Sequence, residues 1–220
     1  MEMPKSIQRI YWLGEQILLG IKLQLLFLIG FLAGGIILGF FPALTATMKI
    51  LLRRFSEPAR DNPRQNQLNP LWHEYWTYYR HVFWQVNGIS AMTVAVTAII
   101  VLDFAVNRLY LKSAVIQFVL VVLSVLGLLF WIYLYPVYNR YQLTFWQYFR
   151  QTAIIALSNI RYSLATFAAL SGATAIFTLF PALLTLAIVP LYLTPIVWFI
   201  YQACAHVEMK VNYAGGGDPQ

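Results

Sequence analysis

Long apolar runs separated by short polar segments dominate the chain. A helix that crosses a bilayer needs about 20 mostly apolar residues. Five runs meet this requirement: residues 23–41, 86–104, 114–135, 162–179 and 183–204. We therefore predict an all-α fold, a polytopic membrane helix bundle of about five transmembrane helices in a single integral membrane domain, residues 1–220. Residues 180–182 are expected to form a tight turn between the last two spans.

Three further segments combine apolar and polar positions in a way typical of helices at the membrane surface. Residues 44–55 place an apolar stripe at helical spacing, with Lys49 and Arg53 on the other side. Residues 71–84 and 143–156 are rich in Trp and Tyr, whose rings prefer the boundary between lipid and water. We predict that all three are interfacial helices on the cytoplasmic side.

Two of these segments resemble each other. Residues 75–80 (YWTYYR) align with residues 145–150 (FWQYFR), and each precedes a predicted transmembrane hairpin. A duplicated unit of one interfacial helix and two spans would explain the match, and parallel repeats occur in membrane transporters. Independent selection of aromatic residues and arginine at an interface explains six positions equally well, so both interpretations stand.

Composition and charge support a membrane protein. Hydrophobic residues make up 60% of the chain and charged residues 10%, too few to hydrate a soluble surface. The net charge is +7, but the cations lie between apolar runs and not on one basic face, so no nucleic-acid partner is expected. With the N-terminus outside, ten of the 15 cations lie inside and five outside. The positive-inside rule thus predicts N-out and C-in, in the cytoplasmic membrane.

The segment GFFPALTATMK (residues 39–49), followed by the aromatic helix, resembles the YesL-like family of bacterial integral membrane proteins. Pro42 and Ala43 would belong to that family's first element, and Tyr75, Trp76, Tyr79 and Phe83 to its second. The resemblance extends to size and layout of spans. It implies a domain of unknown function and an association with carbohydrate uptake, so importer permease or ATPase subunits become candidate partners.

A few polar or helix-breaking residues inside or beside the spans could contact a ligand or partner. Asp103 is the acid inside a span, although its position near the outer surface also allows a structural pairing with Arg108. Pro190 interrupts the last span, and interrupted helices can mark transporter sites. The other candidates are the span-flanking polar residues Asn87, Asn159, Arg80 and Arg150.

Small residues in the first span point to close helix packing. Gly30, Gly34, Gly35 and Gly39 give two successive Gly-x-x-x-Gly spacings, which let helix backbones approach each other in lipid. Packing within the monomer is the simpler interpretation, and an oligomer is compatible with the same pattern. The spacing of the histidines, acids and Cys204 predicts no metal site, and phosphate-loop and nucleophile-elbow motifs are absent from the sequence.

These patterns favour a protein that is not an enzyme and needs no cofactor. The leading hypothesis is a non-catalytic membrane subunit that assists or regulates a transport system, with carbohydrate import as the case implied by the resemblance. The alternative is an oligomeric small-solute transporter or channel. Substrate, partner and oligomeric state do not follow from the sequence.

Overall fold

The computed structural model describes residues 5–56, 67–181 and 183–214, with side chains described for residues 14–56, 67–181 and 187–209. These residues form α-helices and one π-helical turn and no strand, which confirms the all-α prediction. The elements are α1 (Lys5–Ala33), α2 (Ile37–Ser56), α3 (Leu68–Val106), the π-helical turn η3 (Asn107–Leu111), α4 (Ala114–Arg140), α5 (Phe145–Ser158), α6 (Ile160–Leu179) and α7 (Leu183–Ala214).

Five helical segments in the described residues are long and apolar enough to cross a membrane, as predicted. They are Gly14–Ala33, Leu68–Leu111, Ala114–Arg140, Ile160–Leu179 and Ala187–Met209. The first of them differs most from its prediction, because the helix expected over residues 23–41 does not exist as one element.

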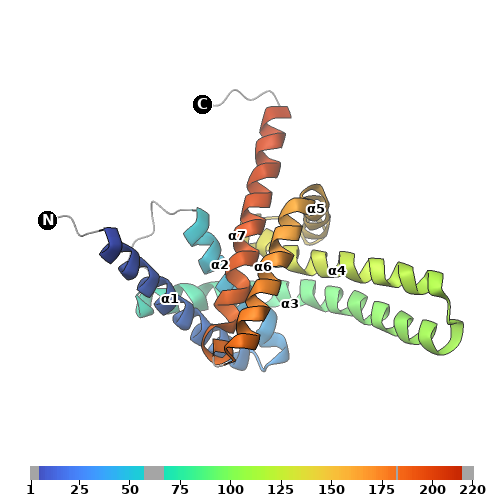
Figure 1. The fold of residues 1–220 in the computed structure, drawn as a ribbon, viewed down its shortest axis with the longest axis horizontal. Coiled ribbons are helices and arrows are strands. Elements are labelled where there is room, and N and C mark those ends of the chain that lie inside the picture. The colour runs from blue at the N-terminus through green and yellow to red at the C-terminus, as the bar shows by residue number, and fades with distance from the viewer. Residues whose placement is uncertain (1–4, 57–66, 182, 215–220) are drawn as a thin grey trace.

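The first span ends at a tight chain reversal. Gly35 adopts a left-handed conformation with φ +73°, the amide of Ile36 donates to the carbonyl of Phe31 over 3.0 Å, and the amide of Gly35 donates to that of Leu32 over 3.0 Å. This is the Schellman arrangement that closes a helix C-terminus on glycine. Residues 23–41 are therefore divided between α1 and α2, which run side by side in opposite directions (Figure 1).

The glycines of the expected Gly-x-x-x-Gly stripe consequently lie on different elements. Gly30 is in α1, Gly34 and Gly35 form the turn, and Gly39 is in α2. A Cβ on Gly34 would overlap the Cα of Gly39, and a Cβ on Gly30 would overlap the Tyr75 hydroxyl. Glycine is required at these positions because the α1–α2 turn is tight and packs closely against α3. The glycines do not form one continuous helix face.

Residues 44–55 of α2 pack inside the body, because α1, α3, α4 and α7 all contact α2. Their apolar stripe therefore faces other helices of the protein, and a position of this segment at the membrane surface stays a prediction. The small or β-branched α2 residues Ala43, Thr45, Ala46 and Thr47 are almost wholly buried. These short side chains allow the neighbouring helices to approach α2 on several faces.

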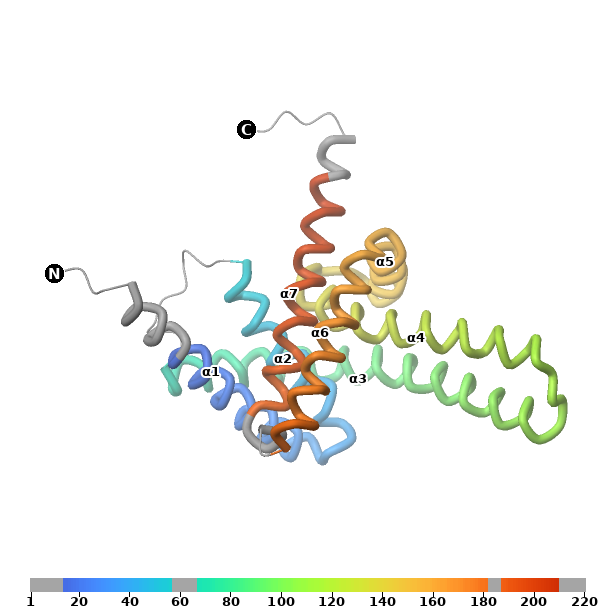
Figure 2. Tube along the Cα trace, viewed as in Figure 1, coloured from blue at the N-terminus to red at the C-terminus, as the bar shows by residue number. Residues whose placement is uncertain are grey.

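Helix α3 joins two predicted elements into one rod. The expected interfacial helix 71–84 and the span 86–104 are continuous, and α3 is about 58 Å long at 1.5 Å per residue. Its first half packs in the body, where Leu71 and Tyr75 are fully buried. Its second half leaves the body sideways, turns at η3 and returns as α4 (Figures 1 and 2).

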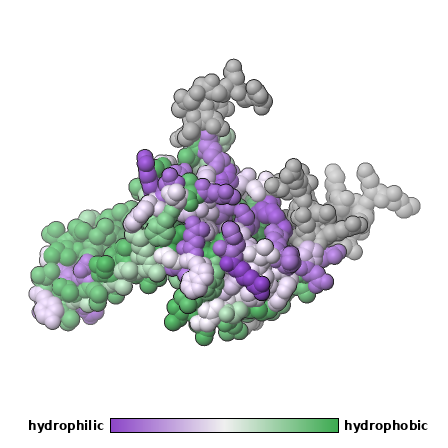
Figure 3. All heavy atoms as spheres, turned by 180° about the vertical axis from the view of Figure 1, so that it is seen from behind, coloured by the Kyte–Doolittle hydropathy of each residue, from purple (hydrophilic) through white to green (hydrophobic). Residues whose placement is uncertain are grey.

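The outer part of this α3–α4 hairpin is covered with exposed apolar side chains. Only 6% of the most apolar window in α4 and 17% of that in α3 are buried, against 39% in α7. Figure 3 shows the hairpin as a mostly green, apolar projection, while hydrophilic residues gather on the body. Asn107 closes the hairpin turn, with its Nδ2 donating to the carbonyl of Ser113 and to Gln117 Oε1.

The chain after α4 builds the rest of the body. A capping box between Thr144 and Gln147 starts α5, in the predicted interfacial segment 143–156. Asn159 separates α5 from α6, and α6 packs against α7. The two aromatic segments compared above differ in context, because residues 75–80 lie inside α3 while residues 145–150 begin a helix of 14 residues.

Candidate functional site

A buried asparagine near the end of α4 connects three helices. Asn139 is 5% exposed. Its Oδ1 accepts from the Tyr78 hydroxyl over 2.8 Å, and its Nδ2 donates to the backbone carbonyl of Thr45 over 3.0 Å. Lys49 Nζ donates to the Asn139 carbonyl over 3.1 Å and lies 5.6 Å from the centre of the Tyr78 ring. One amide thus joins α2, α3 and α4.

Lys49 is the cation of this cluster and is about half buried. Burial lowers the pKa of Lys49 below its ordinary value, because the low-dielectric surroundings disfavour the ammonium form. The carboxylate of Glu74 acts in the opposite direction. Glu74 itself forms an ion pair with Arg53, which joins α2 to α3, while the hydrogen bond from Lys49 to Asn139 joins α2 to α4.

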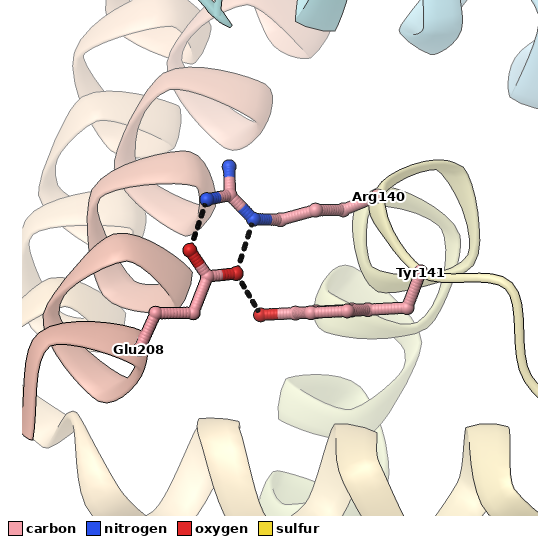
Figure 4. A network of polar contacts seen from close by, with 3 residues as sticks. All are labelled: Arg140, Tyr141 and Glu208. Carbon is pink, nitrogen blue, oxygen red and sulfur yellow. Dashed lines mark hydrogen bonds and ion pairs between the residues drawn. The ribbon is translucent and has the colours of Figure 1, made fainter. Parts of the chain in front are cut away.

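An ion pair joins the end of α4 to α7 (Figure 4). Arg140 Nε donates to Glu208 Oε1 over 2.9 Å and Nη2 donates to Oε2 over 2.6 Å, while the Tyr141 hydroxyl donates to Oε1 over 2.7 Å. The guanidinium also lies 4.7 Å from the centre of the Tyr201 ring. Burial is the main cause that raises the pKa of Tyr141, so its hydroxyl stays a donor to the carboxylate.

Tyrosines continue the network on either side of Asn139. Tyr138 donates to Gln85 Oε1 over 2.8 Å, and its ring lies 4.8 Å from that of Tyr148. The Tyr148 hydroxyl donates to the Tyr141 carbonyl and accepts from the Leu143 amide, each over 3.1 Å. The connection between α4 and α5 is therefore fixed by side chains of the same network.

Further along the hairpin, hydrogen bonds between α3 and α4 continue in antiparallel order. Ser90 Oγ lies 3.0 Å from the Tyr135 hydroxyl, and Trp131 Nε1 donates to Thr97 Oγ1 over 3.1 Å. With the Tyr78–Asn139 and Tyr138–Gln85 pairs, these contacts form a polar ladder that fixes the register of the two helices. We call the residues joined around Asn139 and Arg140 the α4-end network; its other members are Lys49, Arg53, Glu74, Tyr78, Tyr138, Tyr141, Tyr148 and Glu208.

The α4-end network has the properties of a connector. Its charged groups are matched within the protein: Arg140 by Glu208, Arg53 by Glu74, and Lys49 by a carbonyl oxygen. The described residues contain no group of three or more His, Cys, Asp or Glu side chains that could hold a metal ion. Chemically, the arrangement couples the position of the α3–α4 hairpin to α2 and α7.

Asn87 has a specific structural role. Its Nδ2 donates to the carbonyl of Leu38 over 3.0 Å and to that of Phe83 over 2.8 Å. Four residues after Leu38 stands Pro42, which has no amide hydrogen to donate to the Leu38 carbonyl. Asn87 therefore supplies from α3 the hydrogen bond that the proline removes from α2.

The other polar candidates lie apart from Asn87. Asp103 is exposed on the hairpin, 16 residues further along α3, which is about 24 Å in a helix. Asn159 is buried at the α5–α6 junction, where its Nδ2 donates to the Ile155 carbonyl over 3.3 Å. The three polar residues predicted within or beside the spans are thus not brought together into one cluster.

Pro190 is buried in α7 beside Gly20 of α1. The neighbouring amide of Val189 donates to Gln24 Oε1 over 2.9 Å, and Thr194 Oγ1 donates to the Pro190 carbonyl over 2.6 Å. Helix α7 continues through Pro190 without interruption, and side chains of the protein form hydrogen bonds with backbone groups next to the proline.

The two arginine candidates are both exposed. Arg150 lies on α5. Arg80 lies on α3, where it lines a surface hollow with Trp72, His73, Trp76 and Thr77.

Sequence reasoning missed Asn139, Arg140 and Glu208, and it gave Lys49 only a surface position. One signal was available: Arg140 and Glu208 are opposite charges close to the ends of two apolar runs. Nothing in the sequence places these two ends next to each other.

Part of the chain is similar to a known protein family. Residues 21–104 match the family model described as a protein of unknown function, DUF624. No curated protein and no solved structure matches the chain. The matched segment includes the end of α1, Lys49, Tyr78 and Asn87, and it ends before Asn139 and Glu208. The match therefore covers the α2 and α3 residues of the α4-end network and not those of α4 and α7.

Proposed function

We propose that the chain is a non-catalytic integral membrane protein that acts as an accessory or regulatory subunit of a transport system in the bacterial cytoplasmic membrane. In this proposal it docks to importer subunits, a permease or its ATPase, through the α3–α4 hairpin. The projecting hairpin is the observation that carries the proposal. Carbohydrate import is the case suggested by the YesL-like resemblance.

The exposure of the hairpin supports a role in docking. Its large apolar side chains point outward on several sides, as in Val101 (61% exposed), Leu102 (64%), Phe118 (70%) and Val115 (74%). Lipid can surround such apolar side chains. The outer part of the hairpin, however, has little contact with the rest of its own chain, so its surface is also accessible to another helix. A transmembrane helix of another subunit could pack along it without displacing any part of the body.

The grooved face of the hairpin supports the same role. Thr97, Ser124, Gly127 and Trp131 line, with neighbouring apolar residues, a hollow of about 380 Å³ between the two helices. A Cβ on Gly127 would meet nothing within 4 Å. Small residues and hydroxyls at an open helix surface are the features that favour helix association in lipid.

The α4-end network supports an accessory role more than a catalytic one. Its polar side chains are engaged with each other and with backbone carbonyls across α2, α3, α4 and α7. A partner that moves the hairpin would therefore act on the whole body through this connector.

Site-specific photo-cross-linking in intact cells tests the docking surface. A photoreactive side chain replaces Leu102 on the hairpin or, as a matched control, Leu164 on α6, which are 64% and 65% exposed. We expect protein cross-links from position 102 and lipid cross-links alone from position 164. Mass spectrometry of the cross-linked product identifies the partner.

The transport role has a separate test. Deletion of the gene is expected to reduce uptake of the importer's sugar, and a Leu102→Trp variant is expected to behave like the deletion while Leu164→Trp behaves like the wild type. Unchanged uptake together with cross-links to no importer component would refute the proposed function.

An oligomeric small-solute transporter is the alternative function. The observation in its favour is the pair Pro190 and Pro195 inside α7, since each proline removes a backbone hydrogen bond and frees a carbonyl that a solute could contact. Purified protein in liposomes distinguishes the two functions. Solute flux that depends on this protein alone would favour the transporter, and binding to importer subunits without flux would favour the accessory subunit.

The α1–α2 reversal also changes the proposed orientation. The prediction of N-out and C-in assumed that residues 23–41 cross the membrane once. Because α2 instead returns beside α1, we propose that the start of α1 and the end of α7 share the cytoplasmic side. The contact of Phe55 in α2 with Trp198 in α7, and the Arg140–Glu208 pair, bring the basic ends of α2 and α4 next to α7, which supports this orientation.

Cysteine labelling tests this orientation in a background without the buried Cys204. Cysteines at Gly14, Met209 and Arg108 probe the start of α1, the end of α7 and the hairpin tip. A membrane-impermeant maleimide should label position 108 on whole cells, and positions 14 and 209 only after lysis. Labelling of position 14 with protection of position 209 would restore the N-out and C-in orientation.

A further inference from the structure

One face of the body half of α3 carries a surface hollow with an unusual combination of side chains. Trp72, His73, Trp76, Thr77 and Arg80 line a space of about 390 Å³, and we call it the Arg80 hollow. All five residues come from successive turns of one helix. The two tryptophan rings lie 5.7 Å apart at 57° to each other and form an aromatic wall. The volume falls in the range of roughly 300–1,000 Å³ typical of small-ligand sites.

The positive charge of Arg80 in the hollow is not paired with an acid among the described residues. Arg80 and His73 are exposed, and neither forms an ion pair or hydrogen bond with another of the described residues. The acid nearest in sequence, Glu74, is paired with Arg53 of α2. The guanidinium of Arg80, the imidazole of His73 and the hydroxyl of Thr77 can therefore all serve an anionic ligand.

The position of the hollow along α3 points to the ligand's source. Trp84, 78% exposed, lies one turn beyond Arg80, about 6 Å along the helix, and the exposed apolar stretch begins at Val94, about 15 Å beyond Trp84. Exposed tryptophans of this kind occupy the boundary between hydrocarbon and headgroups. This neighbourhood would place Arg80 at the depth of the lipid headgroups, together with Lys49 and Arg53, which contact the same half of α3.

We propose that the Arg80 hollow binds the headgroup of an anionic phospholipid. Arg80 donates to the phosphate oxygens, His73 and Thr77 contribute further donors, and the Trp72 and Trp76 rings pack against the glycerol backbone. The acyl chains extend along the exposed surface of α3 toward Trp84. This inference depends on the membrane location of the chain and not on the docking of a transport partner.

Native mass spectrometry of the full-length protein in a neutral detergent tests the proposal, with short-chain phosphatidylglycerol as the probe and phosphatidylcholine of equal chain length as the control lipid. We expect preferential binding of phosphatidylglycerol to the wild type. Arg80→Gln should weaken that binding about tenfold or more, as the loss of a charged hydrogen bond predicts. Trp72→Ala should weaken it severalfold.

Arg108→Gln at the hairpin tip is the matched control, since it removes the same charge from another exposed site. It should change phosphatidylglycerol binding by less than about twofold. Equal losses in Arg80→Gln and Arg108→Gln would mean general charge attraction and overturn the proposal, as would equal binding of phosphatidylcholine.

Two further results separate the lipid from other ligands. Competition by soluble glycerol phosphate at concentrations equal to the lipid would assign the hollow to a free phosphate ester and overturn the lipid assignment. A photoreactive side chain at His73 should cross-link lipid in cells. Cross-linking of a protein there, with no phosphatidylglycerol preference, would replace the lipid by a protein partner.

Discussion

The hydrogen bond from Asn87 to the Leu38 carbonyl makes a quantitative prediction. Asn87→Leu removes the donor that replaces the missing amide hydrogen of Pro42. The carbonyl then has no hydrogen-bond donor from Asn87 or from position 42. An unsatisfied buried carbonyl destabilises a protein by about 1–3 kcal/mol, and hydrogen bonds measured in membrane proteins reach about 1.7 kcal/mol. We expect a loss of about 1–2 kcal/mol in the free energy of unfolding.

The second hydrogen bond of Asn87 contributes much less to this value. Its acceptor, the Phe83 carbonyl, lies four residues earlier in the same helix and can accept from the Asn87 backbone amide. Removing the side chain therefore leaves that carbonyl satisfied. The predicted loss in the free energy of unfolding comes almost entirely from the unpaired Leu38 carbonyl.

A double-mutant cycle with Pro42→Ala isolates the compensation. Alanine at position 42 restores the backbone amide that can donate to Leu38, so Asn87→Leu should then destabilise the protein by less than about 0.5 kcal/mol. The measurement is reversible unfolding in mixed micelles, followed by circular dichroism. Pro136→Ala in α4 is the control background, where Asn87→Leu should keep its full effect. Equal losses in all three backgrounds would refute the compensation.

Three further perturbations follow from the packing and the α4-end network. Gly34→Ala should destabilise the protein by about 1–3 kcal/mol, because its Cβ would overlap the backbone of α2. Gly127→Ala should cause no loss of stability in the same unfolding assay, because its Cβ would meet nothing and alanine favours a helix. Burial lowers the pKa of Lys49, so between that lowered pKa and pH 10.5 the unfolded state binds more protons than the folded state, and stability should rise with pH in this range. Lys49→Met should flatten this rise. A pH profile of stability that is the same in the variant and the wild type would contradict the reasoning. Arg140→Gln and Glu208→Gln should each destabilise by about 1–2 kcal/mol, and the double variant by about 1 kcal/mol less than their sum; strict additivity would mean that the pair contributes nothing.

The class of fold was readable from the residues alone. Long apolar runs are demanded by the thickness of the bilayer, and few soluble architectures tolerate them. Five membrane-crossing helices were expected and five candidate segments are present in the described structure. The π-helical turn η3 lies between the predicted spans 86–104 and 114–135, and the capping box of α5 lies inside the predicted segment 143–156, because local hydrogen bonding decides where a helix ends.

The first span shows where local patterns stop being sufficient. Gly34 and Gly35 are equally compatible with close packing along one helix and with a Schellman turn that ends it. The turn places α2 among α1, α3, α4 and α7, where its small buried residues fit. Packing over the whole body therefore decides between one continuous helix and a turn at Gly34 and Gly35. The turn also changes the side of the membrane on which we expect the N-terminus.

The α4-end network depends on the packed fold even more strongly. Lys49, Asn139 and Glu208 are separated by 90 and 69 residues along the chain, and each could face solvent in a helix considered alone. Asn87 has a role only because the fold places it opposite the carbonyl that Pro42 leaves free. Periodicity identifies helices because it acts within a few turns. Which helix ends meet is decided by contacts between distant segments, and the polar groups of this network are positioned by those contacts.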